Sequence, residues 1–149
     1  MNYYDFQVVF QEVPGEISLC FTICGCPIRC KGCHSSHLWN EENGELLTYK
    51  KFKQLLLQYD DLATCVVFMG GEWHEEELLK MLKIAKKHMY KTCLYTGQEN
   101  VSKAICNELN WIKTGKWVEE LGGLSSKNTN QKFIDVKTNT IKNNLFIKT

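Results

Sequence analysis

Short apolar runs that end in glycine alternate with amphipathic segments along the middle of the chain, and this alternation constrains the fold most. The run 65–69 is closed by Gly70 and Gly71, as is typical of a strand covered on both faces. Similar runs at 92–96 and 111–114 end at Gly97 and Gly115. Strand–helix–strand units of this kind form right-handed crossovers in a parallel sheet. The pattern predicts an α/β fold with helices on the outside and functional groups at the carboxyl ends of the strands.

The helices between these strands are predicted from apolar spacing. A helix begins after Thr48, a suitable N-cap, and another begins at the three glutamates 75–77, which favour a helix N-terminus. A short helix is expected over 101–109. The apolar stripe of the second helix is predicted to comprise Leu78, Met81, Leu82, Ala85 and Met89.

Strands are also expected near both ends of the chain. The runs 6–10 and 17–23 flank a turn at Pro14-Gly15, and two short β-like runs cover 133–136 and 145–147. The strand at 17–23 leads directly into a cluster of cysteines.

Length and charge narrow the class of protein. A chain of 149 residues with 44% apolar composition predicts one domain over 1–149. Its 18 basic and 17 acidic side chains nearly cancel, so neither nucleic acid nor a membrane surface is an expected partner. The N-terminus lacks a basic and apolar leader, and the apolar stretch 62–71 is too short to span a bilayer. A soluble, cytoplasmic protein is expected.

Cysteine is concentrated in one segment, with five of eight residues between positions 20 and 33. Such crowding favours a metal site over a disulfide framework. Cys26, Cys30 and Cys33 form a C-x3-C-x2-C motif on one short loop. Three thiolate ligands on a four-iron cluster leave one iron open, which suits chemistry better than simple electron transfer.

Other interpretations of these cysteines remain open. A structural zinc site would use the three together with Cys24, His34 or His37. A ferredoxin-like electron carrier would need Cys24 as a fourth ligand. Buried free cysteine packs as a small apolar residue. That role is expected for Cys20, Cys24, Cys65, Cys93 and Cys106.

The C-x3-C-x2-C spacing resembles that of the radical S-adenosylmethionine enzymes, in which the fold is a compact partial (β/α) barrel. The resemblance implies that S-adenosylmethionine chelates the open iron of a [4Fe–4S] cluster and is cleaved reductively to methionine and a 5′-deoxyadenosyl radical. The same resemblance implies that Gly70, Gly71 and Glu72 bind the methionyl ammonium of S-adenosylmethionine. Two departures are Trp73 in place of the family's proline and Gly32 in place of an aromatic residue. The adenine contacts are therefore expected from His34 or Tyr95.

Further segments resemble one subgroup, the activating enzymes of anaerobic, class III ribonucleoside-triphosphate reductases. These segments are 25–35 with Leu38-Trp39, then 95–97, 115–118 and 129–131. The resemblance implies a protein substrate, the reductase, which receives a glycyl radical, and a flavodoxin-type electron donor. Another glycyl-radical activase or a small-molecule synthase is the alternative within the superfamily.

Three tryptophans are candidates either for docking such a protein substrate or for packing in the core. Trp39 and Trp117 are candidates for docking the reductase, since tryptophan is enriched at interface hot spots, whereas Trp111 is expected in the core. The segment 128–131 is either a loop that lines the site or a solvated turn.

Overall fold

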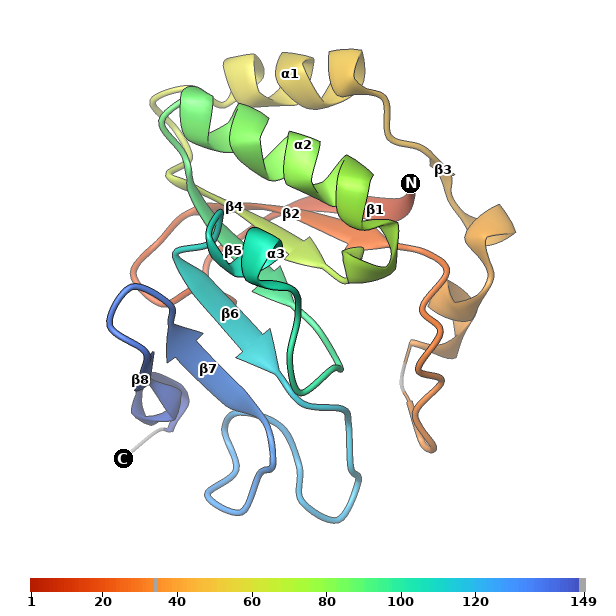
Figure 1. Ribbon diagram of the computed structural model, residues 1–149, viewed down its shortest axis with the longest axis vertical. Helices are drawn as coiled ribbons and strands as arrows, with labels where there is room; N and C mark the ends of the chain where they lie inside the picture. The colour runs from red at the N-terminus through yellow and green to blue at the C-terminus, as the bar shows by residue number, and fades with distance from the viewer. Residues whose placement is uncertain (34, 148–149) are drawn as a thin grey trace.

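The strands of the protein form one mixed sheet in a computed structural model that describes residues 1–33 and 35–147 (Figure 1). Among these residues the strand order is β3-β1-β2-β4-β5-β6-β7-β8. The pairs within β2-β4-β5-β6 are parallel, and the other pairs are antiparallel. The bounds are β1 Asn2–Val9, β2 Ser18–Ile23, β3 Glu45–Leu46, β4 Cys65–Met69, β5 Lys91–Tyr95, β6 Trp111–Thr114, β7 Lys132–Asp135 and β8 Thr140–Ile141.

The predicted α/β fold is confirmed. The predicted parallel sheet is correct for the four central strands and wrong for the outer ones, which pair antiparallel. The connections from β1 to β2 and from β7 to β8 are too short for a crossover, which needs about a dozen residues, so these strands return antiparallel. The longer connection 115–131 contains no helix, and β7 also pairs antiparallel with β6.

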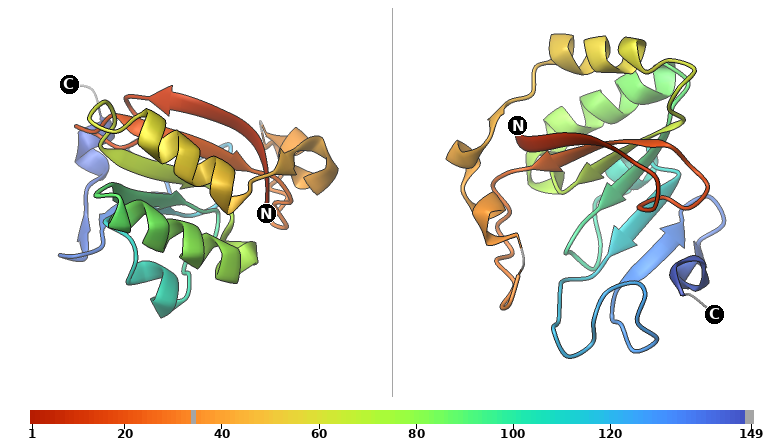
Figure 2. Two further views of the ribbon diagram at one scale, coloured as in Figure 1. Left: turned by 90° about the horizontal axis from the view of Figure 1, so that it is seen from above. Right: turned by 180° about the vertical axis from the view of Figure 1, so that it is seen from behind.

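Three α-helices lie on one face of the sheet, as Figures 1 and 2 show: α1 (Tyr49–Gln58), α2 (Glu75–Lys87) and α3 (Lys103–Cys106). Thr48 caps α1 as predicted, because its Oγ1 accepts a hydrogen bond of 3.1 Å from the amide of Lys51. The larger core lies under these helices, where the aromatic rings of Phe21, Phe52 and Phe68 are fully buried and in contact.

The predicted stripe of α2 is correct at four positions and wrong at the fifth. Leu78, Met81, Leu82 and Ala85 are buried, whereas Met89 is 90% exposed. The helix ends at Lys87, and Met89 then adopts a left-handed φ of 70°, which turns its side chain away from the sheet. The third helix is also shorter than the predicted segment 101–109.

A second, smaller core covers the opposite face of the sheet. The buried cysteines Cys20, Cys65 and Cys93 belong to it, as expected of free thiols that pack as apolar groups. Burial raises the pKa of both Cys20 and Cys65 to about 12, so these thiols stay protonated near neutrality. Trp111 packs against this core with its side chain partly exposed, and Cys106 is also partly exposed.

The predicted strand at 145–147 is wrong, because the chain forms a 3-10 helix, η4 (Asn143–Phe146), at this place. The centres of the Phe146 and Phe133 rings lie 4.9 Å apart, so this helix packs on β7. The strand that follows β7 in the chain and pairs with it is β8. None of the helices in the described residues is long and apolar enough to cross a membrane.

Candidate active site

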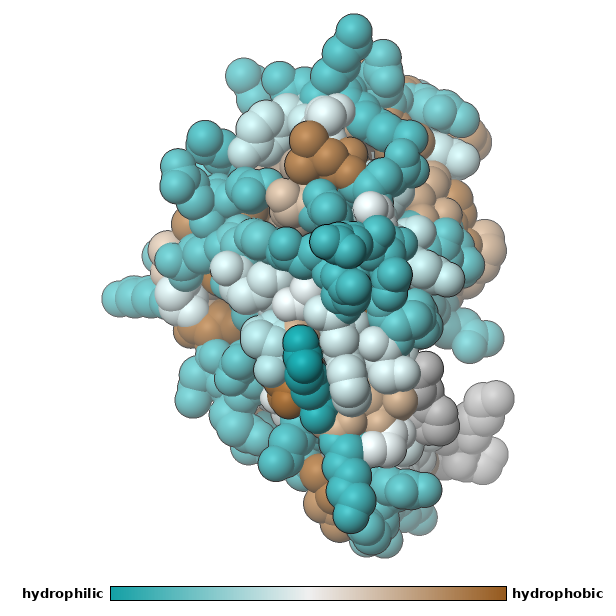
Figure 3. All heavy atoms as spheres, turned by 90° about the vertical axis from the view of Figure 1, so that its right-hand side faces the viewer, coloured by the Kyte–Doolittle hydropathy of each residue, from teal (hydrophilic) through white to brown (hydrophobic). Residues whose placement is uncertain are grey.

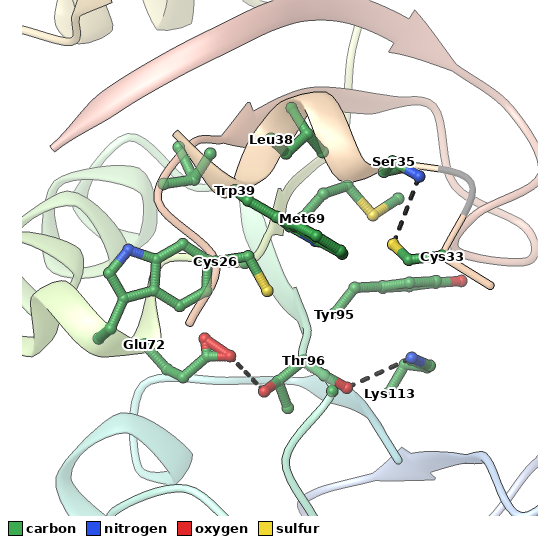
Figure 4. Close-up of a pocket in the computed structure, with 14 residues that line it drawn as sticks. Cys26, Cys33, Ser35, Leu38, Trp39, Met69, Glu72, Tyr95, Thr96 and Lys113 are labelled. Carbon is green, nitrogen blue, oxygen red and sulfur yellow. Dashed lines mark hydrogen bonds between the residues drawn. The ribbon is translucent and has the colours of Figure 1, made fainter. Parts of the chain in front are cut away.

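A cavity of about 240 Å³ opens at the carboxyl ends of the four parallel strands (Figure 4). The 3-10 helix η1 (Ser36–Trp39) and the described residues of the cysteine loop, 24–33 and Ser35, form one wall of this cavity. The strand ends and the turns that follow them form the rest. The cavity thus brings together side chains from distant parts of the chain, among them Cys26, Cys33, Trp39, Glu72, Tyr95 and Lys113.

The cysteine loop folds back onto η1 through backbone hydrogen bonds. The amides of Gly25 and Cys26 both donate to the carbonyl oxygen of Leu38, at 2.6 and 3.2 Å. Within the loop, the amide of Cys33 donates to the carbonyl of Cys30 at 3.1 Å, and the amide of Ser35 donates to Sγ of Cys33 at 3.3 Å. These bonds hold the two ends of the loop beside the cavity.

The three predicted cluster ligands do not all face the same space. Cys26 and Cys33 line the cavity, whereas Cys30 lines an adjacent groove of about 390 Å³ together with Lys116 and Trp117. In the part of the chain that the structure describes, no group of three His, Cys, Asp or Glu side chains is placed to hold one metal ion. All three cysteines are free and partly exposed on one short loop, and soft thiolate donors of this kind suit an iron–sulfur cluster. A cluster bound by all three requires Cys30 to turn towards the cavity.

Two of the alternative ligands for zinc or for a fourth iron, Cys24 and His37, make other contacts. Cys24 is fully buried, and its Sγ lies so close to Gly44 that a Cβ there would be 2.6 Å from it. His37 places its ring 4.7 Å from the ring of Tyr4. His34 lies outside the described residues.

The glycine turn after β4 has a backbone that favours glycine at both positions. Gly70 and Gly71 have φ values of 86° and 112°, in the left-handed region. A Cβ at Gly70 would lie 2.6 Å from the indole of Trp73, which therefore packs directly over the turn. The chain continues into the 3-10 helix η3 (Glu72–His74), so the turn directs Glu72 into the cavity (Figure 4).

Glu72 presents one unpaired carboxylate oxygen at the cavity wall. Its Oε1 accepts a hydrogen bond from the hydroxyl of Thr96, while the buried Oε2 has no hydrogen-bond partner among the described residues. Burial raises the pKa of Glu72, and the Thr96 hydrogen bond opposes that shift. A buried oxygen of this kind normally has a hydrogen-bond donor, and a bound ammonium group would supply one.

Tyr95 and Lys113 complete the wall on the side of β5 and β6. The Tyr95 hydroxyl donates to the carbonyl of Glu12 at 2.5 Å, which fixes the ring beside the cavity. Lys113 Nζ donates to the carbonyls of Gly115 at 2.8 Å and Thr96 at 3.3 Å. Burial lowers the pKa of Lys113 to about 8.

The cavity therefore contains predicted and unpredicted residues. Gly70, Glu72 and Tyr95 line it as expected, although their contacts with a ligand stay predictions, while Gly71 packs behind them near Met1. Thr96 and Lys113 were not singled out. A usable signal was available for Lys113, because it is a charged residue within the apolar strand 111–114 that ends at a glycine.

Comparison with known proteins agrees with a cluster at this site. A family model described as a 4Fe-4S single cluster domain matches residues 14–136, well over half of the chain. The 7-carboxy-7-deazaguanine synthase of Buchnera aphidicola subsp. Schizaphis graminum (strain Sg) is 26% identical over 134 residues. The match takes in 74% of this chain and 60% of the synthase, so the chain spans about three fifths of that relative's length. The chain therefore belongs to the family of 4Fe-4S single cluster domains, and its cofactor is a [4Fe–4S] cluster.

Proposed function

We propose that this protein is an activating enzyme that cleaves S-adenosylmethionine reductively and generates a glycyl radical on an anaerobic ribonucleoside-triphosphate reductase. The observation that carries the proposal is that the segments resembling such activases lie together at one end of the sheet. Residues of the cysteine loop, of Leu38-Trp39 and of 95–97 line the cavity, and residues 116–118 line the adjacent groove. A Cβ at Gly97 would lie 2.6 Å from the side chain of Ile28 in the cysteine loop. The side chain of Asn130 donates to the carbonyl of Lys116 at 3.1 Å, which joins the segments after β6 and before β7.

The size of the cavity favours a substrate that approaches from outside. Small-ligand sites usually enclose about 300–1,000 Å³, and this cavity of about 240 Å³ lies below that range. With a cluster and S-adenosylmethionine both bound, a cavity of this size would leave no enclosed space for a further small molecule. A glycine loop of a partner protein could instead close the open side of the cavity and exclude water from it.

Each lining residue has a defined task in this proposal. Cys26, Cys30 and Cys33 would hold the cluster, and the cluster with S-adenosylmethionine supplies the radical chemistry when bound. Glu72 would accept a hydrogen bond from the methionyl ammonium through its unpaired Oε2. Tyr95, held from behind by the carbonyl of Glu12, would present its ring to the adenine.

The reductase would dock against the side of the molecule that carries the cysteine loop and the connection 115–131. Figure 3 faces the cysteine-loop side and shows a mostly hydrophilic surface with small, separate apolar areas. A mixed surface of this kind suits a partner that binds and leaves, as a substrate must. In this proposal the parallel strands β2-β4-β5-β6 correspond to the partial barrel, and a flavodoxin-type protein donates the electron.

The proposal is tested by mixing the anaerobically reconstituted protein with an anaerobic reductase from the same genome, S-adenosylmethionine and a one-electron reductant. The expected result is a glycyl radical on the reductase, detected by electron paramagnetic resonance. A reductase variant in which the candidate C-terminal glycine is changed to alanine should give no such signal. Cleavage of S-adenosylmethionine without any radical on the reductase would contradict this assignment.

A second candidate, a small-molecule synthase, is favoured by one observation. The relative that matches this chain at 26% identity is a 7-carboxy-7-deazaguanine synthase. Formation of 7-carboxy-7-deazaguanine by the reconstituted protein, with no radical on the reductase, would establish this candidate in place of the activase.

Thr96 offers a prediction about the binding of S-adenosylmethionine. Its hydroxyl donates to Glu72 and accepts a hydrogen bond of 3.0 Å from the amide of Gln98, so it fixes the carboxylate that we assign to the ammonium. Thr96→Val should weaken binding of S-adenosylmethionine about tenfold, the usual effect of losing one hydrogen bond to a charged group. Thr96→Ser should restore most of the affinity, measured by equilibrium dialysis. Equal weakening by both variants would contradict a positioning role for the hydroxyl.

A further inference from the structure

Lys113 places a positive charge at the wall of the cavity, facing the segment that carries the cysteines. It lies on β6, in register with Tyr95 on β5 and with Phe133 on β7, in the interior of the sheet. Its side chain is partly buried and lines the same cavity as Cys26 and Cys33 (Figure 4). A lysine in such a place is unusual, because the ammonium group loses part of its hydration.

The neighbours that hold this ammonium group are neutral. Nζ donates to two backbone carbonyls, of Gly115 and Thr96, and lies 6.0 Å from the centre of the Tyr95 ring. Among the residues that the structure describes, no carboxylate lies within 4.0 Å of Nζ, so the charge has no direct ion-pair partner. Its position is therefore fixed while its charge remains available to other groups in the cavity.

The groups whose negative charge acts on Lys113 belong to the site itself. Burial lowers the pKa of Lys113 to about 8, and the negative charge that Cys30 and Glu72 carry when ionised opposes that shift. Lys113 lines the cavity and Cys30 lines the adjacent groove, so their electrostatic interaction reaches from one to the other. A cluster held by Cys26, Cys30 and Cys33 would thus carry its charge beside this ammonium group.

We propose that Lys113 raises the reduction potential of the cluster, by holding one positive charge next to the centre that receives the electron. Reduction adds one electron to the cluster and makes its net charge more negative by one. A fixed positive charge in a poorly hydrated site stabilises the reduced form more than the oxidised form. No proton transfer is needed for this effect. The inference rests on the cysteine ligation proposed above, but not on which substrate receives the radical.

The alternative is that Lys113 only joins the ends of β5 and β6 through its two hydrogen bonds. Lys113→Gln separates the two roles, because the amide group keeps a hydrogen-bond donor and removes the charge. Lys132→Gln is the matched control: it removes the same charge from an exposed position on the neighbouring strand β7, which lines neither the cavity nor the groove of Cys30 and where water screens it.

The experiment is a redox titration of the reconstituted full-length chain without S-adenosylmethionine, followed by the electron paramagnetic resonance signal of the reduced cluster. We expect Lys113→Gln to lower the ratio of reduced to oxidised cluster at a given potential about tenfold, which equals a shift of about 59 mV to more negative potential. Lys113→Arg and Lys132→Gln should stay close to the unchanged protein. Iron content and melting temperature, measured in parallel, report whether each variant folds and binds the cluster.

Two results would overturn the inference. One is an unchanged potential in Lys113→Gln, and the other is an equal shift in the Lys132→Gln control. If Lys113→Gln takes up less iron than the unchanged protein, Lys113→Met, which keeps the apolar stem of the side chain, provides the same comparison. Because the titration contains neither S-adenosylmethionine nor reductase, its outcome is independent of whether the protein forms a glycyl radical on that partner.

Discussion

Changing Cys26, Cys30 or Cys33 singly to alanine is expected to abolish both the cluster and the cleavage of S-adenosylmethionine. With only three thiolates available from the loop, loss of one leaves two, and a four-iron cluster then lacks a protein ligand at a second iron. The reconstituted protein should contain about four irons per chain, and each variant should contain far fewer. Iron and sulfide analysis measures the cluster, and chromatography of 5′-deoxyadenosine measures the cleavage.

Two further cysteines serve as controls for this result. Cys106→Ala should keep both cluster and cleavage, because Cys106 lies on α3, which covers one face of the sheet, and it does not line the cavity. Cys24→Ala should also keep the cluster, since the Cys24 thiol packs against Gly44. A Cys24 variant as damaged in iron content as the other three would contradict the three-ligand assignment and favour a four-cysteine centre.

Changing Glu72 to Gln should have the largest effect on the binding of S-adenosylmethionine outside the cysteine loop. The amide keeps the shape of the side chain but removes the charge that we pair with the methionyl ammonium. Loss of one partner of a buried charge pair costs about 2 kcal/mol or more, so affinity should fall at least about thirtyfold. Equilibrium dialysis on the reconstituted protein measures this change, and iron content should be unaffected.

The affinity should also depend on pH through the same carboxyl group. Burial raises the pKa of Glu72, so the group becomes protonated at a higher pH than an ordinary glutamate. Binding of the ammonium needs the carboxylate, and affinity should therefore fall as the pH is lowered through this raised pKa. Glu72→Gln should lose that dependence. The exposed Glu76→Gln, on α2, is the control expected to bind normally, and equal weakening by both variants would exclude Glu72 as the ammonium's partner.

The parts of the fold that could be predicted from the sequence are those determined by local pattern. The buried strand at 65–69, the cap at Thr48 and the glycine turn at 70–71 were each expected, because spacing and glycine chemistry are visible along the chain. Met89 was assigned wrongly, because it keeps the apolar spacing although α2 ends two residues before it. The antiparallel pairing of β7 could not be read from its own residues, since it depends on how the connection 115–131 returns.

In the candidate site, only the residues that belong to a sequence motif could be predicted. Glu72 is distant in sequence from Cys26 and Cys33, yet the three line one cavity, as expected for groups at the carboxyl ends of parallel strands. The orientation of Cys30 towards the neighbouring groove depends on backbone angles within the loop, such as the left-handed φ of 50° at Arg29. Lys113 was missed because its importance follows from neighbours on other strands and not from any motif.

The most direct test of the central claim is the electron paramagnetic resonance spectrum of the reconstituted, reduced protein before and after addition of S-adenosylmethionine. If the cluster on Cys26, Cys30 and Cys33 keeps one iron open beside Glu72, the added molecule should change the spectrum, and 5′-deoxyadenosine should form. A spectrum that does not change, together with no 5′-deoxyadenosine, would contradict the assignment of this cavity as the site where S-adenosylmethionine binds and is cleaved.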